Sequence, residues 1–127
     1  MIKRIFIVED DMDISELLEF NLKRQGYIVE TCSNGSEAYQ SIIKELPDLV
    51  ILDLSLPGLS GMEICRYMRN NRHTRKIPVI ILTARTAETD RLASLKSGAD
   101  KFITKPFSIK EILTNIQDLA SRKQTLV

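Results

Sequence analysis

Tryptophan is absent from this chain of 127 residues, and cysteine occurs only twice, as Cys32 and Cys65. The two cysteines lack the CxxC or Cys/His spacing of a zinc site or a redox motif, which argues against both kinds of site. The amino terminus has no apparent secretory signal, so we expect two reduced thiols in the core of a cytoplasmic protein. No apolar run approaches the roughly 18 residues of a membrane span, and we therefore expect no membrane-embedded segment.

Neither sign of charge is in excess, because 18 Lys and Arg residues oppose 17 Asp and Glu residues and leave a formal net charge of +1. This balance does not favour an anionic partner for the chain as a whole. One segment, Arg66–Lys76, holds five basic residues and no acidic one. Since it coincides with a predicted helix end and loop, we interpret it as solvated surface and expect no direct binding of nucleic acid.

The chain does contain a series of short apolar segments that predict strands. The clearest is Leu49–Asp53, in which four apolar residues run without alternation and end in an acid, as in a strand covered on both faces. The segment Tyr27–Cys32 is more polar, which suits an edge strand. The remaining predicted strands are Lys3–Glu9, Ile77–Leu82 and Lys101–Thr104.

Apolar residues at helical spacing fill the segments between the strands. The first predicted helix ends at Gly26 with a left-handed cap, the second stops before Pro47, and the third opens at Ser60. The fourth, Thr86–Ser97, has the least apolar support, and the last begins with a capping-box pattern at Ser108. The expected inner faces comprise Ile14, Leu17, Leu18 and Leu22; Ala38, Tyr39, Ile42 and Ile43; Ile64, Cys65 and Met68; and Ile109, Ile112, Leu113, Ile116 and Leu119.

Five strands that alternate with five helices predict an α/β fold, a flavodoxin-like (βα)5 doubly wound parallel sheet with strand order 2-1-3-4-5. With 127 residues and a hydrophobic content of 43%, the chain fits one domain with a single core. We expect this domain to span residues 1–122 and a short tail to occupy residues 123–127.

Polar residues stand at or just after the carboxyl ends of four predicted strands, where ligands bind in open parallel sheets. Each has an ordinary alternative: Asp53 suits a turn, Asp10 or Asp11 the N-cap of a helix, Thr83 a helix cap, and Lys105 a solvated surface. The predicted strand order brings all of these strand ends to one crevice, which favours a shared site. Its members are Glu9, Asp10, Asp53, Thr83 and Lys105.

Three neighbouring carboxylates raise one another's pKa unless a cation compensates their charge. Magnesium prefers one or two carboxylates, together with waters and phosphate oxygens. This preference fits Asp10 and Asp53 as direct ligands, the backbone carbonyl of Ser55 as a third, and Glu9 acting through water. The sequence therefore predicts a Mg²⁺ site.

A carboxylate is also a nucleophile toward phosphorus and forms an aspartyl phosphate. Phosphoryl transfer requires mainly positioning and positive charge around the equatorial oxygens. We expect Asp53 to attack, with Lys105 on one phosphoryl oxygen and the Thr83 hydroxyl with the Ala84 N–H on another. Pro106 directly after Lys105 suits a cis bond that fixes this loop.

Taken together, these motifs resemble the response-regulator receiver domains of two-component signalling, over practically the whole chain. The resemblance implies that Asp53 accepts phosphate from a phosphohistidine of a sensor histidine kinase or phosphotransfer protein, with magnesium required. It also implies Thr83 and Phe102 as switch residues, and a face made by the fourth helix, fifth strand and fifth helix that shifts on phosphorylation to control an output. Because His73 is the single histidine and lies in a predicted loop, the donor belongs to another protein. The motifs are Val8–Asp11, Leu52–Asp53, Leu56–Gly58 with Gly61, Leu82–Ala84, Gly98–Asp100 and Lys105–Phe107.

Within that family the chain is most similar to the receivers of OmpR/PhoB-type winged-helix regulators, which dimerise through charge pairs on the shifting face. Three positions depart from their pattern: Lys101 and Asn115 stand where an acid and a base are usual, and Phe102 replaces the usual Tyr. We therefore expect a monomer or a weak homodimer. The similarity rests on Thr83–Arg85, Asp90–Arg91, Asp100, Glu111 and Arg122.

Two other functions compete with this interpretation. A pseudo-receiver would be a non-phosphorylated interaction module, but the acidic cluster, Thr83 and Lys105 are all present. An aspartyl-phosphate phosphatase of the haloacid-dehalogenase type needs a second Asp two residues after the nucleophile, where this chain has Ser55. We thus expect a signalling domain that catalyses only its own phosphorylation and dephosphorylation. Its output is left open between a stand-alone regulator, part of a hybrid kinase and part of a transcription factor.

Overall fold

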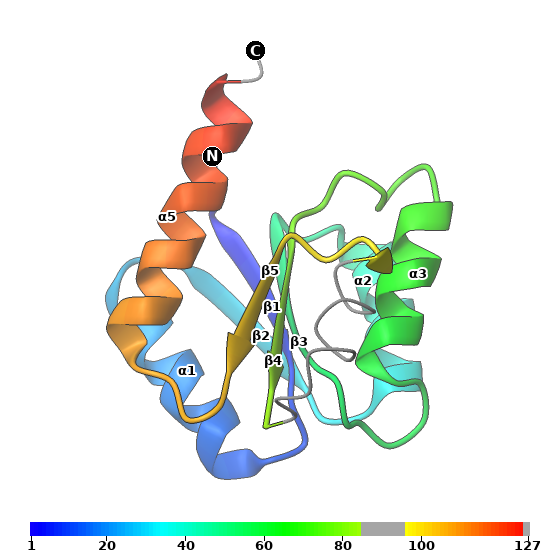
Figure 1. Ribbon diagram of the computed structural model, residues 1–127, viewed down its shortest axis with the longest axis horizontal. Coiled ribbons are helices and arrows are strands. Elements are labelled where there is room, and N and C mark those ends of the chain that lie inside the picture. Colours follow the sequence, from blue (N-terminus) through cyan, green and yellow to red (C-terminus); the bar gives the residue numbers. More distant parts are fainter. Residues whose placement is uncertain (85–95, 126–127) are drawn as a thin grey trace.

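Five parallel strands form one sheet in a computed structural model that describes residues 1–84 and 96–125 (Figure 1). The strand order is β2-β1-β3-β4-β5, as predicted, and every neighbouring pair is parallel. The more polar strand β2 lies at an edge, and β3 is buried along its whole length. The strands are β1 (Arg4–Val8), β2 (Ile28–Cys32), β3 (Leu49–Asp53), β4 (Val79–Thr83) and β5 (Lys101–Thr104).

Helices cover both faces of the sheet, as right-handed crossovers between parallel strands require. In the described part of the chain, α1 and α5 lie on one face and α2 and α3 on the other (Figure 1). The fourth predicted helix, Thr86–Ser97, falls mostly within residues 85–95, outside the described residues, as do Arg85, Asp90 and Arg91. The described helices are α1 (Met12–Arg24), α2 (Gly35–Glu45), α3 (Gly61–Asn70) and α5 (Ile109–Thr125).

The helix ends follow the predicted local signals. Gly26, just beyond α1, has a φ of 96°, in the left-handed region that favours glycine. Ser60 caps α3 in a capping box with Glu63, and Ser108 Oγ accepts a hydrogen bond from the N–H of Glu111 at 3.1 Å. Helix α5 continues to Thr125, so the boundary that we expect between residues 122 and 123 stays a prediction.

The core consists of two apolar layers, one on each face of the sheet. Nearly all of the expected inner faces contribute to these layers, but Leu17 is 48% exposed, and its predicted inward position is wrong. The buried stripe of α1 runs through Ser15, Leu18 and Leu22. Leu17 directly precedes Leu18 and is therefore rotated about 100° from it around the helix axis.

Both cysteines are free thiols, as expected; Cys65 is buried and Cys32 is partly buried. Within the described residues, no helix has the length and apolar character needed to cross a membrane.

Candidate functional site

The carboxyl ends of β1 and β3 place two acidic side chains next to each other. Asp53 is the last residue of β3, and Glu9 directly follows β1, whose Val8 is in register with Leu52. Both acids are buried, with 5% exposure for Asp53 and 1% for Glu9. Burial of two carboxylates at one sheet edge requires compensating positive charge.

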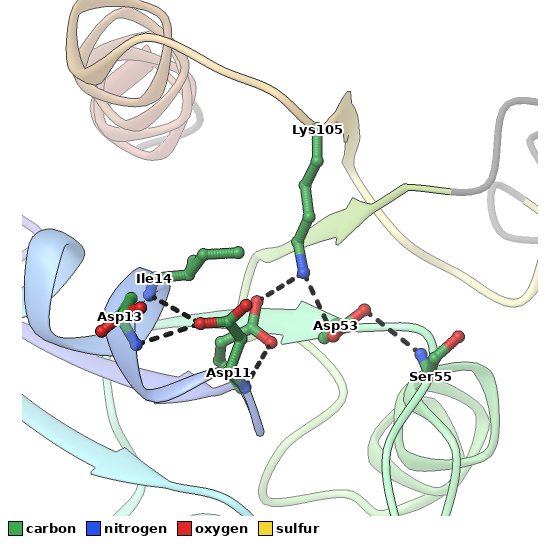
Figure 2. A network of polar contacts seen from close by, with 7 residues as sticks. Asp11, Asp13, Ile14, Asp53, Ser55 and Lys105 are labelled. Atoms are coloured by element: carbon green, nitrogen blue, oxygen red, sulfur yellow. Dashed lines mark hydrogen bonds and ion pairs between the residues drawn. The ribbon is translucent and has the colours of Figure 1, made fainter.

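Lys105 supplies part of that charge from the end of β5. Its Nζ lies 2.8 Å from Oε1 of Glu9 and 3.2 Å from Oδ2 of Asp53, and Figure 2 shows it reaching down toward Asp53. The backbone N–H of Lys105 donates to the carbonyl of Thr83 at 2.8 Å, which fixes this residue beside β4. The Lys105–Pro106 bond is cis, as the sequence suggested.

A third carboxylate completes the cluster. Glu9, Asp10 and Asp53 each offer an oxygen, and these oxygens lie within 4.8 Å of one another. Asp10 is exposed, and the N-cap of α1 is the next residue, Asp11, whose Oδ1 accepts from the N–H groups of Asp13 and Ile14 (Figure 2). Capping the helix therefore does not occupy the Asp10 carboxylate.

Burial dominates the electrostatics of Glu9. Desolvation, together with the neighbouring Asp53, raises the pKa of Glu9 from 4.5 to about 7, although the contact with Lys105 and a hydrogen bond from the Asp11 N–H act in the opposite direction. For Lys105, burial lowers the pKa, but the contacts with Glu9 and Asp53 outweigh it and raise the pKa. The cluster thus holds more negative charge than Lys105 alone compensates.

The donor set fits a hard divalent cation. The Oε1 atom of Glu9 is buried, and apart from its ion pair with Nζ of Lys105 at 2.8 Å it has no hydrogen-bond partner among the described residues. A buried carboxylate oxygen whose one described partner is an ammonium shared with Asp53, beside two further carboxylates, leaves negative charge that a cation would compensate. An oxygen-only set with few carboxylates matches the preference of Mg²⁺.

The structure also places the other predicted site residues along this edge. Thr83 ends β4 and is buried, Ala84 follows it and is exposed, and the N–H of Ser55 donates to Oδ1 of Asp53 at 3.2 Å. Phe102, on β5, is in register with Ile81 and is partly buried against the layer under α2 and α3.

One element near the site was missed from the sequence. The sequence Ser33-Asn34-Gly35 predicts a turn, whereas in the structure Asn34 is the N-cap of α2 and Gly35 is its first residue. The N–H of Gly35 donates to the carbonyl of Pro57, in the loop that follows Asp53. The Asn-Gly pair is an equally good turn signal, so the sequence alone did not separate the two structures.

Comparisons with known proteins agree with this geometry. The sequence profile of the response regulator receiver domain matches residues 5–117. The chain is 42% identical over 122 residues to the phosphate regulon transcriptional regulatory protein PhoB of Rhizobium meliloti (strain 1021), covering 96% of this chain and 54% of PhoB. The chain thus spans about half the length of this curated relative.

Solved structures of receiver domains superimpose closely. The BeF3-activated N-terminal receiver domain of Klebsiella pneumoniae RstA matches with a TM-score of 0.84 and 31% identity, over 91% of this chain and 96% of that one. The receiver domain of the sensor histidine kinase PA1611 from Pseudomonas aeruginosa PAO1, which has a magnesium ion coordinated in its active site cleft, matches with a TM-score of 0.85 and 29% identity, over 94% and 98%. With the profile match over most of its length, this chain belongs to the response regulator receiver domain family.

Proposed function

We propose that Asp53 accepts a phosphoryl group from a phosphohistidine of a sensor histidine kinase or phosphotransfer protein in a Mg²⁺-dependent reaction. The observation that carries this proposal is the cluster itself. Oxygens of Glu9, Asp10 and Asp53 lie within 4.8 Å of one another, and Lys105 Nζ lies 3.2 Å from the Asp53 carboxylate.

The ion would be held by the carboxylates of Asp10 and Asp53 and by the backbone carbonyl of Ser55, with Glu9 acting through a water. When bound, Mg²⁺ supplies positive charge to a phosphoryl oxygen and compensates the carboxylates. The buried Oε1 of Glu9, which among the described residues has the shared Lys105 ammonium as its partner, supports such a cation.

In the transfer step, a carboxylate oxygen of Asp53 forms a bond to phosphorus while the P–N bond of the phosphohistidine breaks and its electron pair returns to the imidazole nitrogen. Lys105, already beside the nucleophile, takes one phosphoryl oxygen as its contact with Asp53 is released. The Thr83 hydroxyl and the Ala84 N–H take another. These groups compensate charge on the transferring phosphoryl group in a largely buried site.

The donor histidine belongs to a partner. His73 is the only histidine in the chain, and it is exposed in the segment between α3 and β4. That segment joins the carboxyl end of α3 to the amino end of β4, so it lies at the edge of the sheet opposite Asp53 (Figure 1).

Phosphorylation would alter the face that includes β5 and α5 and thereby control an output domain or partner in the cytoplasm, with Thr83 and Phe102 as the switch. Lys101 contacts Asp118 at 2.5 Å and Arg122 contacts Asp118 at 3.3 Å, all within one chain. Asp100 pairs with Arg69 at 3.0 Å. Charges that pair internally are less available to a second copy, which supports a monomer or weak dimer.

Acetyl phosphate with magnesium chloride tests the phosphoacceptor assignment. We expect mass spectrometry to find one added phosphoryl group on the wild type and none on Asp53→Asn, which keeps the shape of the side chain but removes the nucleophile. Asp118→Asn, which alters an exposed carboxylate on α5, is the control and should be labelled like the wild type. Labelling of Asp53→Asn at the wild-type rate would refute the assignment, and a wild type that is never labelled would favour a non-phosphorylated interaction module.

A further inference from the structure

The start of α2 packs backbone to backbone against the loop that follows the phosphoacceptor. We name residues 34–36 the α2 seat and residues 54–60 the β3–α3 loop. The N–H of Gly35 donates to the carbonyl of Pro57 at 2.9 Å. The α2 seat is stabilised by a helix cap, because the Asn34 side chain accepts hydrogen bonds from the N–H groups of Ser36 and Glu37.

Glycine is required on both sides of this contact. A Cβ at Gly35 would lie 1.9 Å from the carbonyl oxygen and 2.8 Å from the carbonyl carbon of Leu59. Gly58, across the contact, has a φ of 80°, and a Cβ there would lie 2.7 Å from Oγ of Ser36. An alanine at position 35 therefore displaces backbone and not merely a flexible side chain.

The β3–α3 loop is connected directly to the nucleophile. Its Ser55 N–H donates to Oδ1 of Asp53 at 3.2 Å and so helps to orient that carboxylate. At the other end, the N–H of Gly61 donates to the carbonyl of Leu54 at 3.2 Å. The N–H of Leu54 also donates to the carbonyl of Leu82 on β4 at 3.3 Å. For the middle of the loop, residues 55–59, the described backbone hydrogen bond to another element is the one that Gly35 donates to Pro57.

We propose that Gly35 is a positioning residue for the phosphorylation site. By allowing the α2 seat to hold the β3–α3 loop, it fixes Ser55, whose N–H orients Asp53 and whose carbonyl would complete the magnesium site. The inference rests on the proposed function, since it concerns the same site. The first residues of α2 thus control the affinity of the site for its cation, although they contribute no ligand.

The test compares the magnesium affinity of unphosphorylated wild type and Gly35→Ala by isothermal titration with magnesium chloride. Loss of an outer-shell support typically weakens metal binding by about 10- to 100-fold, and we expect a dissociation constant raised by that factor. Because the loop moves, the backbone amide resonances of Ser55 and Leu59 should also shift in ¹H–¹⁵N spectra.

Gly26→Ala is the matched control. Gly26 also has a positive φ, 96°, but a Cβ there meets nothing within 4 Å, so the variant strains the backbone without touching the loop. It should bind magnesium like the wild type. Equal losses of affinity in Gly26→Ala and Gly35→Ala would overturn the proposal, as would a folded Gly35→Ala with wild-type affinity and an unmoved Ser55 resonance.

Should Gly35→Ala fail to fold, Gly58→Ala carries the test, because the atom nearest to its Cβ is the Oγ of Ser36, an exposed side chain, and not a backbone carbonyl. Weaker magnesium binding in Gly58→Ala is expected, and unchanged binding overturns the proposal. A wild type that does not bind magnesium would refute the proposed function instead. If the wild type binds magnesium and Gly35→Ala binds it equally well, only the role of Gly35 is refuted.

Discussion

Replacement of Glu9 by Gln should change how stability depends on pH. Burial and the neighbouring Asp53 raise the pKa of Glu9 from 4.5 to about 7 in the folded protein. Because the folded pKa lies above the unfolded one, the folded state binds the proton more tightly. The resulting stabilisation is fully present below the unfolded pKa and is lost as the pH rises through about 7.

The size of this effect follows from the shift. One pKa unit corresponds to about 1.4 kcal/mol, so a rise from 4.5 to about 7 represents on the order of 3 kcal/mol of folding stability. Glutamine resembles the protonated carboxyl group in shape and charge and does not titrate. The free energy of unfolding of Glu9→Gln, relative to that of the wild type, should therefore increase by about that amount between pH 4.5 and about pH 8.

The assay is urea denaturation with magnesium removed by EDTA. Far-ultraviolet circular dichroism is the suitable signal, since the chain has no tryptophan. The control is Glu16→Gln, which alters an exposed glutamate on α1 that makes no ion pair among the described residues and should run parallel to the wild type. If the curves of unfolding free energy against pH for Glu9→Gln and the wild type are also parallel, the pKa of Glu9 is not raised in the folded protein.

Three further results are expected. Asp10→Ala should show a severe loss of magnesium affinity in a calorimetric titration, because the variant lacks a direct ligand and one negative charge. An affinity equal to that of the wild type would show that Asp10 is not part of the site. Light scattering should find a monomer or weak dimer, since Lys101 pairs with Asp118 inside the chain and exposed pairs contribute only about 0.2–1 kcal/mol each; a tight unphosphorylated dimer through β5 and α5 would contradict this. We expect the Phe102 ring to turn inward, as in the active state of the proposed switch, in part of the molecules even without phosphate, because the ring has no hydroxyl to leave in water and its full burial is worth roughly 1.5–3 kcal/mol. Phe102→Tyr should therefore lower partner binding of the unphosphorylated protein, and unchanged binding would disprove this partial activation.

The sheet and the composition of its carboxyl edge could be predicted because their signals are local. The apolar run Leu49–Leu52 has no alternation and so requires cover on both faces, which implies a parallel sheet. Once the strand order is set, every strand ends at the same edge, and Asp53, Glu9 and Lys105 meet there without further information. The inward position predicted for Leu17 was wrong because the four apolar residues expected on the inner face of α1 span a wider part of the helix surface than the core covers.

The role of Gly35 was not predictable from local signals, because it depends on a contact with a segment far along the chain. An Asn-Gly pair predicts a turn or a helix start with equal force. Only the folded structure brings the Leu59 carbonyl within 1.9 Å of the position that a Cβ of Gly35 would occupy. A steric requirement of this kind arises when two distant segments of the backbone approach each other, and the residues around Gly35 do not indicate which segment will lie against them.

In the proposed function, Lys105 acts both before and during phosphoryl transfer. In the structure its ammonium lies between Glu9 and Asp53 and compensates part of their charge, while burial favours a proton on Glu9 as the pH falls toward about 7. A bound divalent cation would supply positive charge that favours the ionised form of Glu9 and weakens the contact between Lys105 and Asp53. Under the proposed function, Lys105 would then be available to bind the incoming phosphoryl group. A lysine beside the two carboxylates would thus compensate their charge before the transfer and the charge of the phosphoryl group during it.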